Sequence, residues 1–102
     1  MNNLNSVILE GKFKSITISE GQVDFIVAST RMIKVPKGDD MEVTTEVPCR
    51  AVGSLAESVK KMAEPGLGVR VVGLLQGPLN GSVFILCEHA EYKLGKKTKK
   101  TV

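Results

Sequence analysis

Residues 44–77, TTEVPCRAVGSLAESVKKMAEPGLGVRVVGLLQG, decide the fold of this chain because they hold one short helix between two strand-like segments. The first segment ends a strand predicted over residues 42–52, and the second is the alternating run at residues 67–76. Pro48 lacks the N–H that a central strand needs, so we expect the first of these strands to lie at a sheet edge or to be bulged there. The stretch therefore predicts a strand, a helix, a Pro-Gly turn and a second strand.

The helix is predicted over residues 55–63. Ser54 is a suitable N-cap, and Glu57 stands three residues later, where it completes a capping box. An apolar stripe at helical spacing is formed by Leu55, Val59 and Met62. We expect this stripe to close one end of a barrel, and docking of a partner is the alternative use of such a face.

Two alternating segments precede this stretch, at residues 5–18 and 23–34, and one follows it, at residues 82–92. This order predicts an all-β fold: a five-stranded OB-fold Greek-key barrel with one short helix between strands 3 and 4, an architecture that commonly binds oligonucleotides or oligosaccharides. Gly11 interrupts the first strand, where we expect a bulge or kink that turns a corner of the barrel. The residues predicted to lie in the core include Phe13, Phe25 and Val27.

The chain has 102 residues, 42% of them hydrophobic and 25% charged, which is the composition of one ordinary globular domain. We assign the domain to residues 1–92 and expect the lysine-rich residues 93–102 to form a disordered tail. The net charge of +3 is the difference between 14 basic and 11 acidic residues. Five of the lysines lie in the tail, so residues 1–92 hold nine basic and eleven acidic residues, a net charge of −2. The basic character of the whole chain is therefore no argument for a nucleic-acid-binding body.

Several classes of protein do not fit the sequence. No apolar run approaches the roughly 18 residues that span a bilayer, and the N-terminus lacks the basic region and cleavage site of an export signal. We therefore expect a cytoplasmic protein that does not bind membranes, with Cys49 and Cys87 as reduced thiols on strands. We expect no metal site, no cofactor and no enzymatic activity, because no ligand spacing, phosphate-binding loop or catalytic arrangement is present. The single histidine, His89, is predicted to lie on the surface.

Three segments resemble the bacterial single-stranded DNA-binding proteins. Residues 5–11, NSVILEG, resemble the opening strand of that family, and residues 53–57, GSLAE, resemble its strand-to-helix junction. Residues 65–75, PGLGVRVVGLL, are similar to its helix exit and fourth strand. The resemblance covers residues 5–92 in order. It implies a nucleoid-associated OB-fold homo-oligomer, a dimer or tetramer, that binds single-stranded DNA and works with replication or repair proteins in replication, repair or recombination.

The sequence departs from the family at the positions that stack on bases. The family places aromatic side chains there, whereas the matching positions here are Glu46 or Val47, and Val52. The hairpin after the fourth strand is short, and lysines replace the acidic tail. Because base stacking contributes about 1–3 kcal/mol per base, we expect binding to depend on phosphate contacts and to weaken with salt. The alternatives are RNA as the ligand, a dimer similar to the primosomal replication protein that assists helicase loading, and an assembly module without strong DNA binding.

Oligonucleotides cross OB barrels over strands 2 and 3 and the flanking loops. This favours the basic residues Arg31, Lys34, Lys37 and Arg50, and each has an ordinary solvated charge as its alternative interpretation. Phe84 is the best candidate for stacking on a base, with core packing as the alternative. The predicted nucleic-acid-binding residues are Lys12, Lys14, Arg31, Lys34, Lys37, Arg50, Arg70 and Phe84.

Overall fold

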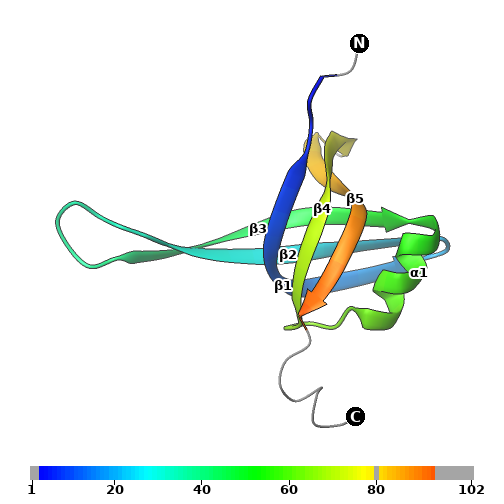
Figure 1. The fold of residues 1–102 in the computed structure, drawn as a ribbon, viewed down its shortest axis with the longest axis horizontal. Coiled ribbons are helices and arrows are strands. Elements are labelled where there is room, and N and C mark those ends of the chain that lie inside the picture. The colour runs from blue at the N-terminus through cyan, green and yellow to red at the C-terminus, as the bar shows by residue number, and fades with distance from the viewer. Residues whose placement is uncertain (1–2, 80, 94–102) are drawn as a thin grey trace, which may run out of the picture.

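The computed structural model describes residues 3–79 and 81–93. Five strands and one helix follow one another in the predicted order (Figure 1): β1 (Val7–Ser19), β2 (Gln22–Ile33), β3 (Met41–Val52), α1 (Gly53–Met62), β4 (Gly68–Leu79) and β5 (Ser82–Lys93). Lys93, which we expected to begin the tail, instead ends β5 and pairs with Gly68 of β4. The remainder of the predicted tail lies outside the described residues.

The strands form a closed barrel in the order β1-β2-β3-β5-β4. β1 takes part in it twice, because residues 7–12 pair with β4 and residues 12–19 pair with β2. β3 and β5 run parallel and join through two residue pairs, Cys49 with Ile85 and Arg50 with Leu86. We call this short junction the seam. The predicted all-β OB barrel with a helix between its third and fourth strands is confirmed.

Gly11 lies where the backbone of β1 passes close to that of β2. A Cβ at this position would lie 2.3 Å from the carbonyl oxygen of Ala28 and 2.8 Å from Cγ1 of Val27, so only glycine fits. The register between β1 and β2 shifts a little further on, between Phe13 and Ser15. The predicted corner therefore has two parts: Gly11 permits the close approach, and the bulge itself lies around Lys14.

The core lies inside the barrel and contains the aromatic residues expected there. Phe13 and Phe25 are 2% and 3% exposed, and their ring centroids are 5.3 Å apart. Tyr92 of β5 stacks on Phe13 with a centroid separation of 6.3 Å. Val27 is fully buried, so the core prediction is confirmed for all three residues. Further buried side chains come from every strand and from α1, among them Val23, Ala51, Val59, Val69, Val71 and Ile85.

The start of α1 differs from the prediction. The helix begins at Gly53, its N-cap residue is Val52, and no side chain accepts a capping hydrogen bond. The expected capping box of Ser54 and Glu57 is therefore wrong. The Gly53 N–H donates instead to the carbonyl oxygen of Gly21, 3.2 Å away in the β1–β2 turn, and Gly53 has φ +64. A contact between distant backbone segments thus starts the helix, and the side chain of Ser54 is not needed.

The apolar face of α1 closes the end of the barrel, as expected. Val59 and Ala56 are fully buried, and Leu55 and Met62 are half-buried. The helix packs against β2, β3 and β5. Its last turn carries Lys60 and Lys61, which suit the negative end of the helix dipole.

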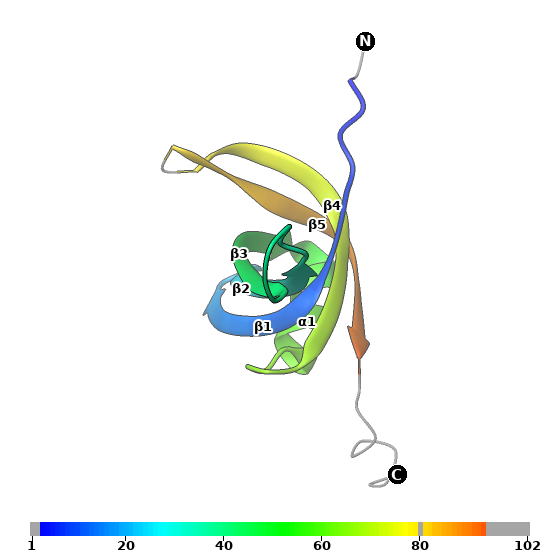
Figure 2. The same cartoon turned by 90° about the vertical axis from the view of Figure 1, so that its left-hand side faces the viewer.

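β2 and β3 continue beyond the barrel as a two-stranded projection, which we call the arm (residues 28–46). The pairing of β1 with β2 ends at Ala28, whereas β2 and β3 stay paired as far as Ile33 and Met41. The hydroxyl groups of Thr30 and Thr44 lie 2.9 Å apart across the arm. The arm extends away from the barrel and α1 in Figure 1 and points toward the viewer in Figure 2. Its side chains are mostly exposed.

Pro48 lies just before the seam. It pairs with Ile26 of β2 on one side, and the pairing of β3 with β5 on the other side begins only at Cys49. The missing N–H of the proline thus coincides with an edge of the sheet, as predicted. Cys49 and Cys87 are buried free thiols on strands, also as predicted. In the part of the chain that the structure describes, no helix is long and apolar enough to cross a membrane.

Candidate nucleic-acid interface

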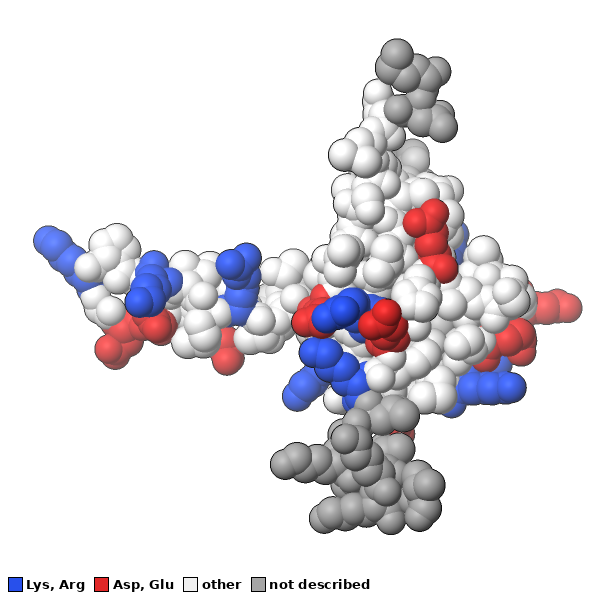
Figure 3. Space-filling view, in the orientation of Figure 1, with Lys and Arg blue, Asp and Glu red and all other residues white. Residues whose placement is uncertain are grey.

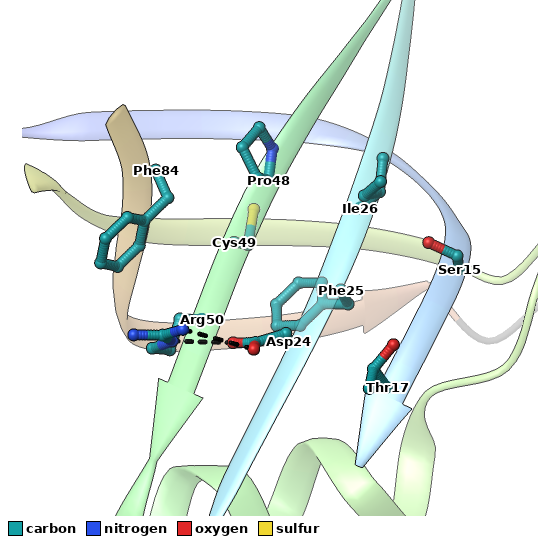
Figure 4. A pocket seen from close by; sticks show the side chains of 9 residues that line it. All are labelled: Ser15, Thr17, Asp24, Phe25, Ile26, Pro48, Cys49, Arg50 and Phe84. Carbon is teal, nitrogen blue, oxygen red and sulfur yellow. Dashed lines mark hydrogen bonds and ion pairs between the residues drawn. The ribbon is translucent and has the colours of Figure 1, made fainter. Parts of the chain in front are cut away.

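A cavity of about 190 Å³ opens on the outer face of β1, β2 and β3, beside the first residues of β5 (Figure 4). Phe25 and Cys49 are buried, so their strand neighbours point to the opposite, outer face of the sheet. Those neighbours are Asp24 and Ile26 on β2 and Pro48 and Arg50 on β3. The residues that line the cavity are Ser15, Thr17, Asp24, Phe25, Ile26, Pro48, Cys49, Arg50 and Phe84.

Arg50 is held in one orientation by two neighbours. Its Nε donates to Oδ1 of Asp24 at 2.8 Å, and its Nη2 lies 3.4 Å from Oδ2. The guanidinium carbon lies 5.0 Å from the ring centroid of Phe84, within the range of a cation–π contact. The hydrogen bond to Asp24 raises the pKa of Arg50 further above its usual value. Asp24 is itself held by Gln22, whose Nε2 donates to Oδ2 at 3.1 Å.

Phe84 is 5% exposed and lies at one wall of the cavity. It packs beneath Arg50 and therefore does not present a free ring face to solvent. None of the four aromatic residues of the chain is exposed, since Phe13 and Phe25 are buried and Tyr92 is half-buried. Phe84 thus packs against Arg50, and its role as a stacking residue stays a prediction.

Lys14 lies on the same outer face, at the bulge of β1. It forms an ion pair with Glu46 of β3, across the intervening strand β2. Both side chains are about half exposed, so the pair is accessible to a ligand. Glu46 stands where the family resemblance places stacking surface, and here it instead neutralises a candidate phosphate contact.

The basic residues Arg31, Lys34 and Lys37 lie at the outer end of the arm, where the described residues offer none of them an ion-pair partner. Three acidic residues share this segment, so residues 31–42 have no net charge. The basic groups lie mostly along one side of the arm and the acidic groups along the other (Figure 3). One side of the outer end of the arm is therefore positive, although residues 31–42 together have no net charge.

The arm residues are separate from Arg50. Arg31 stands seven positions along β2 from Asp24, the partner of Arg50, which is about 23 Å at 3.3 Å per residue. It also follows the alternation of Phe25 and Val27, which places it on the opposite face of β2 from Asp24. The basic residues predicted together therefore lie in two places, Arg31, Lys34 and Lys37 on the arm and Arg50 at the cavity.

Lys12 and Arg70 lie elsewhere on the barrel. Lys12 lines a separate cavity of about 500 Å³ together with Glu10 and Glu42. Nη2 of Arg70 lies 2.6 Å from Oε2 of Glu10, and Nη1 lies 3.6 Å from Oε1 of Glu91. The hydrogen bond and positive charge of Arg70 lower the pKa of Glu10. Arg70 therefore belongs to an ion-pair network on β1, β4 and β5, away from the cavity beside Arg50.

The sequence reasoning did not single out Asp24, Ile26 or Pro48 as parts of a site. Their positions follow from the alternation of β2 and β3, which puts them opposite the buried residues. Asp24 beside Arg50 also requires the register of the two strands, which alternation alone does not give. His89 lies on the surface, as predicted, with its Nε2 3.2 Å from Glu91. Within residues 3–79 and 81–93, no three His, Cys, Asp or Glu side chains gather as metal ligands would.

The comparisons with known proteins identify the fold. No protein-family model and no curated protein sequence matches this chain. Solved structures do match it. The wild-type single-stranded DNA binding protein from Thermus aquaticus is 21% identical with a TM-score of 0.73, over 92% of this chain and 52% of that chain. This chain thus spans about half the length of the Thermus protein.

Two further structures cover nearly the whole of both chains. The Plasmodium falciparum SSB in complex with single-stranded DNA is 16% identical with a TM-score of 0.74, over 91% of this chain and 97% of that chain. The protein priB from Ralstonia solanacearum is 13% identical with a TM-score of 0.65, over 89% and 100%. The barrel, helix and strand order are therefore those of the single-stranded DNA-binding proteins, and the resemblance seen in the sequence is confirmed for the fold.

Proposed function

We propose that this chain binds single-stranded DNA with little sequence preference and acts in DNA replication, repair or recombination. The observation that carries the proposal is the outer face of β2 and β3, where the cavity beside Arg50 lies on the same strand pair as the arm with its basic side. This is the face of an OB barrel across which oligonucleotides run. The similar Plasmodium protein is in complex with single-stranded DNA, which supports the same ligand here.

Binding by one chain is expected to be weak and dependent on salt. No exposed aromatic side chain is available, and Lys14 and Arg50 are already paired with acids. Affinity then depends on phosphate contacts, and each contact to a single strand contributes about 0.7 to the slope of log K against log salt. Association of copies into a dimer or tetramer would raise the affinity through linked sites. The exposed apolar residues Ile8 and Leu4 near the free edge of β1 support such self-association.

The proposal describes a binding protein without catalysis that works in the cytoplasm at the nucleoid, with replication or repair proteins as partners. A titration of fluorescently labelled oligo-dT at low and high salt tests it directly. We expect binding at low salt, a marked loss at high salt, and weaker binding of duplex DNA of equal length. Equal affinity for duplex and single strand would exclude the proposed specificity, and oligo-U in place of oligo-dT decides between DNA and RNA.

Matched double variants test the part played by the arm. Lys34→Ala with Lys37→Ala removes two lysines from the arm, whereas Lys60→Ala with Lys61→Ala removes two exposed lysines from α1 at the opposite end of the molecule (Figure 1). The arm variant should reduce the salt slope by up to about 1.4, two contacts at about 0.7 each, and the helix variant should leave it unchanged. Equal effects of the two variants would mean that the arm has no specific role.

The second candidate is an assembly module that binds protein in place of DNA. It is favoured by the exposed apolar side chains of the arm, namely Met32 (57%), Ile33 (44%) and Met41 (54%). Large exposed apolar groups on one projection are typical of protein contacts. A dimer similar to the primosomal replication protein, the remaining alternative, would combine both uses. Loss of self-association in a Met32→Ser, Met41→Ser variant that still binds oligo-dT would assign the apolar side of the arm to protein contacts and the basic side to DNA.

A further inference from the structure

Arg50 is the most constrained basic side chain on the proposed binding face. Its guanidinium donates two hydrogen bonds to the carboxylate of Asp24, which fix its plane, and its Cζ lies 5.0 Å from the centroid of the Phe84 ring. Its side chain is still 24% exposed. A planar, positively charged group is therefore held beside Asp24 and Phe84 in the lining of the cavity (Figure 4), with part of its surface open to solvent.

We propose that Arg50, supported by Phe84 and oriented by Asp24, is a platform on which one base of the bound strand stacks, and that this base occupies the cavity. The inference rests on the proposed function and adds to it where the binding energy comes from. It gives the chain a stacking surface in place of the aromatic residues that it lacks at Glu46, Val47 and Val52. The ligand group is a nucleobase, and the phosphates of the same nucleotide lie outside the cavity.

The electrostatics favour a base over a phosphate at Arg50. The carboxylate of Asp24 compensates the positive charge of Arg50 at 2.8 Å, which weakens its attraction for a phosphate. Compensation does not remove the flat face of the guanidinium, and such faces stack on unstacked bases in single strands. If Arg50 served only as a phosphate contact, removal of the negative charge of Asp24 would raise the affinity of the chain for single-stranded DNA.

The shape of the cavity also suits one base. Its volume of about 190 Å³ lies below the roughly 300–1,000 Å³ of pockets for drug-sized ligands. Apolar walls come from Ile26 and Pro48, and hydroxyl groups from Ser15 and Thr17 stand at the β1 side. A planar ring between the platform and these walls would be recognised by its faces more than by its edges. Stacking of this kind tolerates any base, which agrees with binding of little sequence preference.

Two substitutions separate the platform from a phosphate contact. Arg50→Lys keeps the charge and removes the plane, and Asp24→Asn removes a negative charge together with one of the two oxygens that accept hydrogen bonds from the guanidinium. If Arg50 is a stacking platform, each variant should weaken oligo-dT binding. For Arg50→Lys the loss should be roughly 5- to 150-fold, which is the change in affinity for one lost base stack. The salt slope should stay that of the wild-type chain. For a phosphate contact, Asp24→Asn should instead bind more tightly.

The affinity for an abasic oligonucleotide of the same length as the oligo-dT separates base stacking from a structural role of Arg50. A structural role would not change the preference of the chain for oligo-dT over the abasic strand. The wild-type chain should prefer oligo-dT over the abasic strand, and Arg50→Lys should lose most of that preference. Thermal melting checks that both variants fold. If the Arg50→Lys variant does not fold, Asp24→Asn remains as an independent test. If the wild-type chain fails to bind oligo-dT at all, the proposed function falls. If it binds but Arg50→Lys keeps the wild-type affinity and base preference, or Asp24→Asn binds more tightly, only the platform is overturned.

Discussion

Replacing Gly11 by alanine tests whether the close approach of β1 and β2 limits the closure of the barrel. The alanine Cβ would lie 2.3 Å from the carbonyl oxygen of Ala28, whereas ordinary Cβ contacts are 3.4–4 Å. To reach an ordinary contact, the strands must separate by about 1.1 Å, the difference between 3.4 and 2.3 Å. Both neighbours at this point are backbone or buried side chain, so no flexible group can move aside.

The cost follows from that separation. Ladder hydrogen bonds of about 2.9 Å would lengthen to about 4.0 Å and be lost. Two such bonds contribute about 1–3 kcal/mol together, and overpacking typically costs about 1–3 kcal/mol more. The lower entropy of the unfolded chain offsets about 0.4–1 kcal/mol of this. We therefore expect a loss of about 2–5 kcal/mol from a total stability on the order of 5–15 kcal/mol.

Urea unfolding followed by circular dichroism measures this loss, and the melting temperature should fall by at least about 10 °C. Gly68→Ala is the matched control, because a Cβ there would meet only side-chain atoms of Lys93, the nearest at 3.0 Å. The control should change the free energy of unfolding by no more than about 1 kcal/mol. A Gly11→Ala protein as stable as the Gly68→Ala protein would refute the reasoning.

Three further predictions concern single side chains. Ser54→Ala should change the free energy of unfolding by less than about 0.5 kcal/mol, because Ser54 does not cap α1, whereas loss of a true cap costs about 1 kcal/mol. The hydrogen bond with Cys87, and then burial, raise the pKa of Cys49 above its ordinary value of 9.0, so only the unfolded state ionises near that pH. Stability should be unaffected by this thiol below pH 9 and should fall as the pH rises above it, and urea unfolding of wild type and Cys49→Ala at pH 7.5 and 10 measures the difference. Glu46→Gln releases Lys14 from its ion pair and should raise oligo-dT affinity at low salt, with a salt slope steeper by about 0.7; an unchanged slope would mean that Lys14 contacts no phosphate.

Most of the fold could be predicted because local patterns agree with it. The ends of each predicted strand and of the helix lie within three residues of those in the structure. The local patterns responsible include the alternation in residues 23–34 and 67–76 and the break at Pro65 and Gly66. The start of α1 could not be predicted in the same way. Its first N–H finds the carbonyl oxygen of Gly21, more than thirty residues earlier, and no local pattern contains that contact. The Ser54 cap was plausible locally and unnecessary in the folded chain.

The site was predicted in parts. Arg50 and Phe84 were both candidates, yet their contact depends on the parallel register of β3 with β5, which follows from closure of the barrel alone. Lys14 and Arg70 were predicted as basic surface without their partners, because ion pairs between strands require the register. Residue type thus indicates which side chains carry charge, and only the three-dimensional arrangement indicates which charges remain available.

The seam has a consequence for motion. It holds two parallel residue pairs, whereas every other junction of the barrel is longer and antiparallel. Parallel pairs are slightly weaker per residue, and proteins open locally where the fewest bonds must break. Arg50 stands on one side of this junction and Phe84 on the other, so a base on the platform would fasten the two strands together. Local opening of the barrel between β3 and β5 can be measured as hydrogen exchange of the amides of residues 49–50 and 85–86. This exchange would slow when single-stranded DNA is bound, so the ligand would stabilise the weakest junction of the fold that binds it.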